Sequence, residues 1–113
     1  MQIIPIRLHG LLDYLSAAML ISAPWLLGFA DGSAAQWVAV AAGAFILIYS
    51  LLTRYERGAV PLIPIRAHLA LDVATGTALI ASPWVFGFAD HILWPHLAFG
   101  LLSLAVPALT RRA

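Results

Sequence analysis

The sequence predicts an all-α protein, an integral membrane four-helix bundle made of two tandem transmembrane helical hairpins. Hydrophobic residues make up 63% of the 113 residues and charged residues only 10%, whereas about a quarter of a soluble domain is charged. The segment from Ile4 to Asp31 recurs from Ile63 to Asp90, at a period of 59 residues. Such self-similarity indicates one structural unit used twice. At about 20 residues per span, the chain has room for four transmembrane helices.

Composition also limits the classes of function. The formal net charge of +1 gives no indication of a nucleic acid partner. The chain has no cysteine, which excludes disulfides, thiolate metal sites and cysteine nucleophiles. The first apolar segment is not expected to be a cleavable signal peptide, because Asp13 interrupts it and the same pattern recurs in mid-chain.

The repeat divides a single membrane domain, residues 1–113, into two units of two helices each. Pro5 and Pro64 suit the first turn of a helix, because the N–H that proline lacks has no partner there. Pro24 is expected to bend or end the first helix, and Gly28 to stop it. We expect repeat 1 over about 4–57, with helices over about 5–27 and 34–55, and repeat 2 over about 63–112, with helices over about 64–86 and 94–111.

The second helix of each repeat carries its own signals. Ser33 and Gln36 have the spacing of a capping box, which predicts a helix start near Ala34. The segment from Ala39 to Ala44 is rich in small residues, which let two helix backbones approach closely in a membrane. It is therefore predicted to be a packing face. Repeat 2 has a shorter turn, and Pro107 is expected to kink the end of its second helix.

The positions of the charged and aromatic residues predict the orientation. Asp31, Asp90 and His91 lie in the turns opposite the arginines, so the positive-inside rule places both termini in the cytoplasm of a multi-pass cell membrane protein. Two spans per repeat give both copies the same topology, related by a pseudo-two-fold along the membrane normal. The six arginines are Arg7, Arg54, Arg57, Arg66, Arg111 and Arg112, and the tryptophans at the outer boundary are Trp25, Trp37, Trp84 and Trp94.

A short motif lies near the end of the first helix of each repeat. It reads Ser82-Pro83-Trp84 in the second copy and Ala23-Pro24-Trp25 in the first. With these residues, the duplicated segment resembles the SPW repeat, a module of small bacterial and archaeal membrane proteins. The resemblance covers nearly the whole chain and implies a location in the bacterial inner membrane. It implies no reaction and no ligand.

The residues most open to a chemical interpretation form a duplicated set: Arg7, His9 and Asp13, and Arg66, His68 and Asp72. Histidine and aspartate four residues apart share one helix face. Ionisable groups at membrane depth are hypotheses of function by default. We favour a structural cluster in which these side chains satisfy one another between the first and third helices.

Two alternatives for this cluster remain open. It could hold a divalent metal, or a haem with His9 and His68 as axial ligands, or it could move protons or ions. No cofactor is expected under the favoured interpretation. Pro24-Trp25 and Pro83-Trp84 are interpreted as a kink and an interfacial anchor, and His96 as an interfacial histidine. Ser82 is expected to bond a backbone carbonyl or a neighbouring helix.

These observations favour an accessory or scaffold component of the membrane that binds lipids or other membrane helices. The alternative is a protein that handles a cofactor, a metal or ions through the paired His/Asp residues. An enzyme is the least supported class, because no nucleophile elbow or phosphate loop is present. The partners expected are the lipid bilayer and either further copies of the chain or a larger membrane complex.

Overall fold

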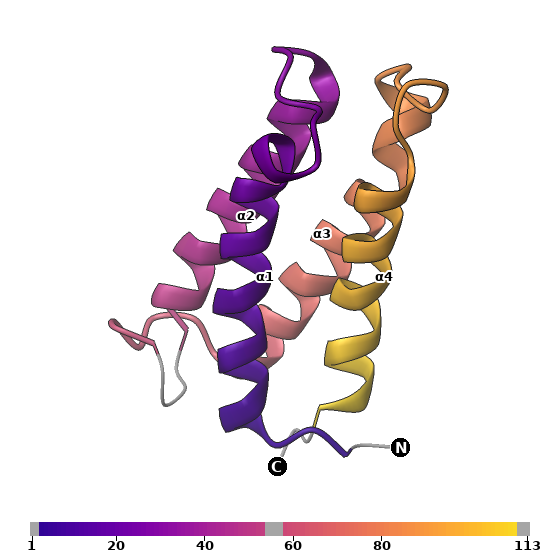
Figure 1. Cartoon of the computed structure of the whole chain (residues 1–113). Coiled ribbons are helices and arrows are strands. Elements are labelled where there is room, and N and C mark those ends of the chain that lie inside the picture. Colours follow the sequence, from indigo (N-terminus) through magenta and orange to yellow (C-terminus); the bar gives the residue numbers. More distant parts are fainter. Residues whose placement is uncertain (1–2, 54–57, 111–113) are drawn as a thin grey trace.

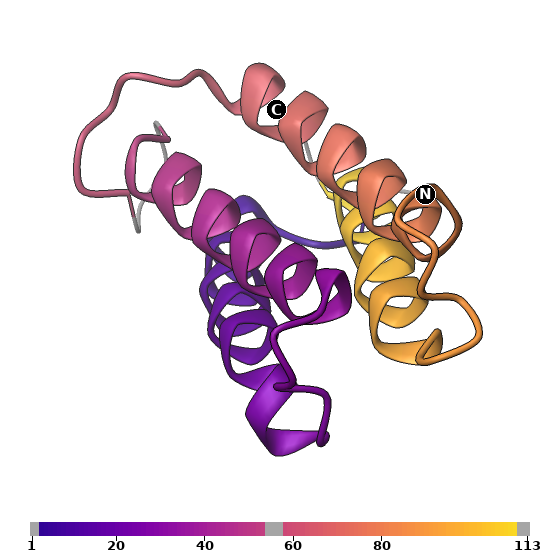
Figure 2. The ribbon, with the colours of Figure 1, turned by 90° about the horizontal axis from the view of Figure 1, so that it is seen from above.

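Four α-helices form two antiparallel hairpins that lie beside each other (Figure 1). The computed structural model describes residues 3–53 and 58–110, and every named element in these ranges is a helix. The prediction of an all-α protein with four helices is therefore confirmed. In one hairpin α1 (Ile6–Leu26) packs along α2 (Ala34–Leu51), and in the other α3 (Ile65–Val85) packs along α4 (Trp94–Leu109). Between the hairpins, α2 contacts α3 and α1 contacts α4. Figure 2 shows the two hairpins from above.

Two short backbone pairings connect the hairpins. Thr53 follows α2 and pairs with Ile63, and Thr110 follows α4 and pairs with Ile4. α2 is thus shorter than the predicted helix, because its chain leaves the helix at Leu52 to make this pairing. Each of the two connections joins the end of one repeat to the start of the other.

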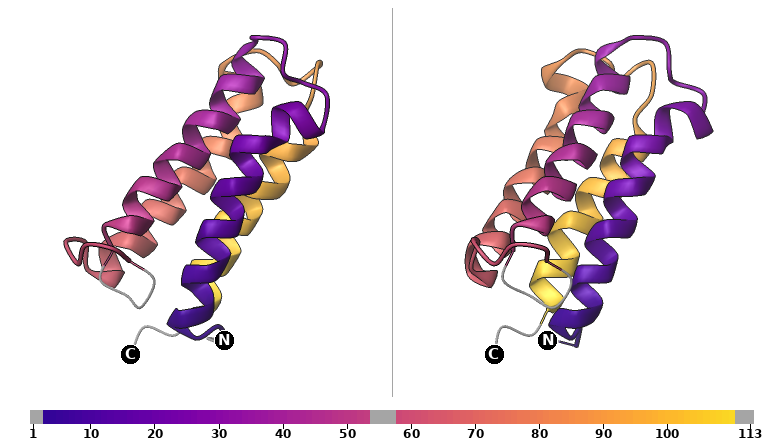
Figure 3. Two further views of the ribbon diagram at one scale, coloured as in Figure 1. Left: turned by 60° about the vertical axis from the view of Figure 1, so that its left-hand side comes forward. Right: turned by 90° about the vertical axis from the view of Figure 1, so that its left-hand side faces the viewer.

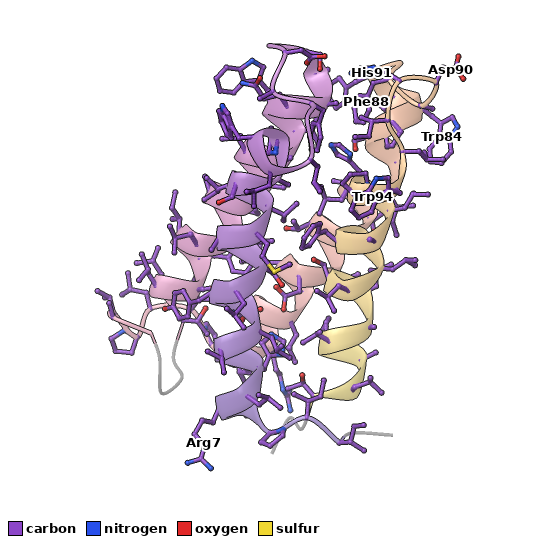
Figure 4. All side chains as sticks on the ribbon, viewed as in Figure 1. Arg7, Trp84, Phe88, Asp90, His91 and Trp94 are labelled. Carbon is purple, nitrogen blue, oxygen red and sulfur yellow. The ribbon has the colours of Figure 1, made fainter. Side chains whose placement is uncertain are left out.

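The two ends of the bundle differ in their side chains. Both hairpin turns lie at one end, and the described ends of the α2–α3 link lie at the other (Figures 1 and 3). Arg7 lies at the link end, whereas Trp84, Asp90, His91 and Trp94 lie at the turn end (Figure 4). The other arginines used to predict orientation divide between Arg66, which is exposed at the start of α3, and Arg54, Arg57, Arg111 and Arg112, which lie outside the described residues.

Helix length and apolarity, taken alone, identify one span in the described chain. α2 has 18 residues with a mean hydropathy of 1.8 and passes both criteria, while α4 is apolar but shorter. α1 and α3 each carry an arginine, a histidine and an aspartate. Helix length and hydropathy therefore do not by themselves identify the four transmembrane helices that the sequence predicts.

The outside of the bundle is unusually apolar, and its inside holds polar as well as apolar side chains. Large apolar residues cover the outside, and all four tryptophans are at least 57% exposed. Inside lie small residues such as Ala17, large apolar residues such as Leu20 and Phe29, and buried polar groups that include His9 and Asp72. Exposed apolar surface of this extent is typical of a surface that contacts other proteins or a membrane.

The proline near the end of α1 does not stop the helix, which continues through Pro24 to Leu26. The stop comes at Gly28, whose φ of +80° lies in the left-handed region that favours glycine. The N–H of Phe29 then donates to the carbonyl of Pro24 at 2.8 Å, which is the long bond of a Schellman motif. Gly87, with a φ of +75°, and Phe88 repeat this ending after α3.

The serine before Pro83 compensates for the missing proline N–H. Pro83 cannot donate to the carbonyl of Leu79, four residues earlier. The hydroxyl of Ser82 donates to that carbonyl at 2.7 Å, inside a buried part of the helix. In the first repeat Ala23 occupies the equivalent position, so this bond belongs to one repeat only. The predicted serine-to-carbonyl bond is therefore present.

The start of α2 differs from the predicted capping box. The helix begins at Ala34, but the Ser33 side chain makes no capping hydrogen bond. Gln36 instead accepts a hydrogen bond from the N–H of Gly32 at 2.8 Å. The glutamine therefore stabilises the turn one residue further from the helix than the motif predicts.

Small residues bring the two helices of each hairpin together. A Cβ added to Gly43 would lie 2.8 Å from the backbone oxygen of Ala17 and 3.0 Å from the backbone nitrogen of Ile21. In the second hairpin, a Cβ on Gly100 would lie 2.9 Å from the oxygen of Gly76. The small-residue face of α2 is thus a packing face against α1.

We predict that Gly43→Leu lowers the free energy of unfolding in detergent by roughly 1–3 kcal/mol, the usual effect of overpacking. The new side chain would collide with the α1 backbone, which cannot move aside as a flexible side chain could. Thermal unfolding followed by circular dichroism measures the effect. The control is Ala41→Leu on the exposed face of α2, and equal melting temperatures for the two variants would contradict the packing.

We predict that Ser82→Ala lowers the free energy of unfolding by about 1–3 kcal/mol, because it removes the hydroxyl that donates to the buried carbonyl of Leu79. Thr77→Val is a matched control, since the exposed Thr77 hydroxyl donates at 2.8 Å to the carbonyl of Val73, within the regular part of α3. The control should change stability by less than about 0.5 kcal/mol. Denaturant unfolding in detergent compares the two, and equal losses would refute the role of Ser82.

Candidate functional site

Four ionisable side chains meet between α1 and α3. His9 and His68 are fully buried, and Asp13 and Asp72 are at most 6% exposed. One side-chain atom from each of the four lies within 4.8 Å of the other three. We call these four residues the His/Asp quartet. It holds two of the duplicated residue types that the sequence singles out, histidine and aspartate.

A proline sets the position of each histidine. Pro5 and Pro64 precede α1 and α3 in an extended conformation, with ψ of 150° and 153°. Their carbonyls accept the N–H of His9 at 3.0 Å and of His68 at 3.1 Å. Each imidazole therefore lies in the first turn of its helix, with the aspartate one turn further along the same face.

The shortest contacts in the quartet run between the hairpins. His9 Nε2 lies 2.9 Å from Asp72 Oδ2, and His68 Nε2 lies 2.7 Å from Asp13 Oδ2. Within one helix the same nitrogens lie further from Oδ2 of their own aspartate, at 3.2 Å for α1 and 3.4 Å for α3. The sequence leaves open whether each histidine bonds the aspartate of its own helix or a residue of the other repeat, and in the structure the aspartate of the other repeat is the closer partner.

Two threonines fix the orientation of the imidazoles. His9 Nδ1 lies 2.7 Å from Thr110 Oγ1, and that hydroxyl lies 2.6 Å from the carbonyl of Val106. His68 Nδ1 lies 2.6 Å from Thr53 Oγ1, which lies 2.6 Å from the carbonyl of Tyr49. A hydroxyl has one hydrogen, and here it is donated to the carbonyl. Each threonine must then accept the Nδ1–H of its histidine, so Nε2 faces the carboxylates.

The protons of the quartet follow from this orientation. If Nε2 of each histidine carried a lone pair, it would face the lone pairs of an ionised carboxylate at hydrogen-bond distance, which is repulsive. Each short Nε2···Oδ2 contact therefore holds a proton. Two imidazoles, two carboxylates and the two protons between them sum to zero charge, which is what makes a buried cluster of such groups tolerable.

The two halves of the quartet differ at one contact. The Tyr49 hydroxyl donates to Asp72 Oδ1, whereas Val106 occupies the equivalent position in the second hairpin. A cavity with about 10 Å³ of space lies beside Asp13 and Asp72, lined also by Val106 and Ser103. That is close to the smallest volume that holds one water molecule.

The structure brings together some of the predicted residues and adds others. The favoured interpretation included Arg7 and Arg66 in the cluster. Both side chains are exposed at the starts of α1 and α3 and lie outside the quartet. Thr53, Thr110 and Tyr49 were not predicted as site residues. The repeated Leu-Thr-Arg after α2 and α4 is the signal that could have identified the two threonines.

His96 is buried at the other end of the bundle. Its Nε2 donates to the carbonyl of Ala35 at 2.9 Å, and its ring lies 5.6 Å from that of Phe29 and 4.7 Å from that of Phe88, measured between centroids. The prediction of an interfacial histidine is wrong, because α4 turns this residue toward α2. His96 is a polar contact between the hairpins near their turns.

The comparison with known protein families agrees with this duplicated architecture. A model of the SPW repeat domain matches residues 7–110. The chain belongs to the SPW repeat family. No curated protein and no solved structure matches it. SPW repeat proteins are membrane-associated, and the family brings no reaction to this chain. In this SPW repeat protein, Pro83 is buried and Trp84 is 60% exposed.

The donor set of the quartet suits a metal ion better than a haem. Two imidazole nitrogens and two carboxylate oxygens are ligands for divalent transition metals. A haem between His9 and His68 needs space for the macrocycle. The imidazole centroids are only 5.3 Å apart, and both Nε2 atoms lie within 3.4 Å of carboxylate oxygens. Axial ligation of a haem does not fit this geometry.

We predict that Asp13→Asn destabilises the SPW repeat protein by about 3–5 kcal/mol, because it leaves the buried imidazole of His68 without its closest carboxylate. Unfolding in detergent by denaturant measures the loss. A smaller value is expected if water from the neighbouring cavity hydrates the imidazole.

The control is Asp31→Asn in the turn before α2. Asp31 Oδ2 lies 3.0 Å from His91 Nε2, but both side chains are about half exposed. Hydrogen bonds from Ser33 and, less strongly, from His91 lower the pKa of Asp31. Exposed pairs contribute little to stability, so Asp31→Asn should be nearly neutral. Equal effects of the two substitutions would refute the structural role of the quartet.

Proposed function

We propose that this SPW repeat protein crosses the cytoplasmic membrane four times, with both termini in the cytoplasm. The observation that carries the proposal is the large exposed apolar surface of the bundle, together with the ionisable groups that lie buried inside it. Arg7 and Arg66 at one end and the exposed tryptophans at the other match the two boundaries of a bilayer.

The helix lengths support this placement. α1 and α3 have 21 residues each, or about 31 Å at 1.5 Å per residue, close to the roughly 30 Å of a hydrocarbon core. Their ionisable residues lower the mean hydropathy of α1 and α3, so composition alone does not identify these helices as membrane spans. In the folded bundle, however, His9, Asp13, His68 and Asp72 face one another, which is the arrangement that membrane-spanning segments require.

Within the membrane, we propose an accessory or scaffold role in which the outer surface binds lipid and neighbouring membrane helices. The quartet supports this role, because its polar atoms bond to one another and to Thr53 and Thr110. The outer surface of the hairpins carries large apolar side chains such as Met19, Phe45 and Leu101. Within lipid there is no hydrophobic drive for association, so helices associate through close packing of their side chains. The helices that pack on this surface would belong to further copies of the chain or to a larger membrane complex.

We predict that single cysteines in the two turns react from outside the cell and that a cysteine in the link does not. The chain has no natural cysteine, so Asp31→Cys, Asp90→Cys and Ala59→Cys each give one exposed thiol. With a membrane-impermeant maleimide on intact spheroplasts, the first two should be labelled. The third should be labelled only after permeabilisation.

Two results would contradict the topology. One is labelling of Ala59→Cys before permeabilisation, and the other is labelling of only one of the two turns. Membrane insertion itself is checked by alkaline carbonate, which removes peripheral proteins. An integral SPW repeat protein should stay in the membrane pellet, and release into the supernatant would refute the proposal.

A further inference from the structure

We propose that the His/Asp quartet is a binding site for one divalent first-row transition-metal ion. The ligands would be Nε2 of His9 and His68 and Oδ2 of Asp13 and Asp72. This inference goes beyond the proposed membrane role and does not depend on the topology. It rests on the orientation of the imidazoles, the convergence of the four donors and the groups that hold them.

The orientation of the imidazoles is the first argument. Thr53 and Thr110 each accept an Nδ1–H, so the metal-binding nitrogen of both rings points to the same place. Metal-bound histidines usually donate their second N–H to a fixed acceptor, which holds the ring and sets its tautomer. Here both acceptors are already in place, and each is oriented by a backbone carbonyl at 2.6 Å.

The convergence of the donors is the second argument. Nitrogen and oxygen alternate around the quartet, with Nε2···Oδ2 separations of 2.7, 2.9, 3.2 and 3.4 Å. A tetrahedral ion with bonds of about 2.0–2.2 Å keeps neighbouring ligand atoms roughly 3.3–3.6 Å apart. The two shortest separations would have to open by roughly 0.4–0.9 Å, which rotations of the side chains supply.

Charge identifies the class of ion. In the metal-free state the two short contacts hold two protons, and the quartet is neutral. Binding one divalent ion forms four metal–ligand bonds and releases both protons to solvent, which leaves the quartet neutral again. A monovalent ion would leave a buried negative charge and a trivalent ion a positive one, and both are costly in an apolar interior. Imidazole ligands favour transition metals over Mg²⁺ or Ca²⁺.

The surroundings of the carboxylates complete the site. Tyr49 donates to Asp72 Oδ1, so the second oxygen of this aspartate is held while Oδ2 faces the imidazoles. Beside Asp13, the cavity of about 10 Å³ has room for about one water molecule. Tyr49 on α2 is a further titratable group beside the imidazoles, with its ring centroid 4.9 Å from that of His68, and Thr110, which follows α4, does not titrate.

The test uses the full-length protein in detergent, purified without a polyhistidine tag and stripped with EDTA. Titration with Co²⁺ should show one ion bound per chain, with visible d–d absorption of a four-coordinate N₂O₂ site. About two protons per ion should be released in weakly buffered solution. Zn²⁺ should displace the Co²⁺ with the same stoichiometry and abolish the absorption.

Two pairs of variants separate this site from adventitious binding. His9→Ala/His68→Ala should lose the Co²⁺ absorption, whereas His91→Ala, in the exposed turn, should keep it. If the double variant does not fold, Thr53→Val/Thr110→Val tests the same site with all four ligands present. It should bind Co²⁺ about 10–100-fold more weakly, while the exposed Thr77→Val should match wild type.

Three outcomes would overturn the proposal. Folded wild-type protein, checked by circular dichroism, could show no binding at one equivalent. His9→Ala/His68→Ala could retain the wild-type spectrum, or the threonine double variant could bind Co²⁺ as tightly as wild type. Any of these would leave the quartet as a hydrogen-bonded contact only, and none would affect the proposed membrane topology, which the labelling experiment tests separately.

Discussion

Four buried ionisable side chains have to neutralise one another, and this constraint organises the bundle. His9 lies closest to Asp72, and His68 lies closest to Asp13. The nearest carboxylate of each histidine is therefore in the other hairpin. The two helices that carry them must face each other at this level. The threonines that hold the imidazoles are supplied from the ends of α2 and α4 and paired there with Ile63 and Ile4. Removing one partner of such a network costs far more than its net stabilisation, because a charge stays buried.

Packing in the rest of the bundle depends on small residues. Within each hairpin the helices meet through Gly43 against Ala17 and through Gly100 against Gly76, where even a methyl group has no space. Close backbone contact of this kind maximises dispersion and does not rely on expelling water. The polar bonds then have a separate role, because they select which helix faces meet, while the small residues determine how close the helices come.

The duplicated sequence was sufficient to predict four helices, their pairing into hairpins and the residues of the quartet. It could not decide which aspartate lies closer to each histidine, because spacing along one helix says nothing about the distance to a neighbouring helix. Thr53 and Thr110 were visible as a repeated Leu-Thr-Arg, yet their role depends on where the chain turns after the helix. His96 was misjudged for a similar reason, since its burial arises from contacts with Ala35, Phe29 and Phe88, which lie far away in sequence.

The bonds between the two hairpins have an evolutionary consequence. A lone hairpin with this sequence pattern would expose His9 and Asp13 without their nearest partners, and a second copy of the same hairpin would supply them. The covalent chain therefore holds together what two identical molecules would form as a symmetric dimer. Fusion of the copies also frees them to diverge. Tyr49 against Val106 and Ser82 against Ala23 are differences that a dimer of identical hairpins cannot have, and the first of them gives Asp72 and Asp13 unequal surroundings.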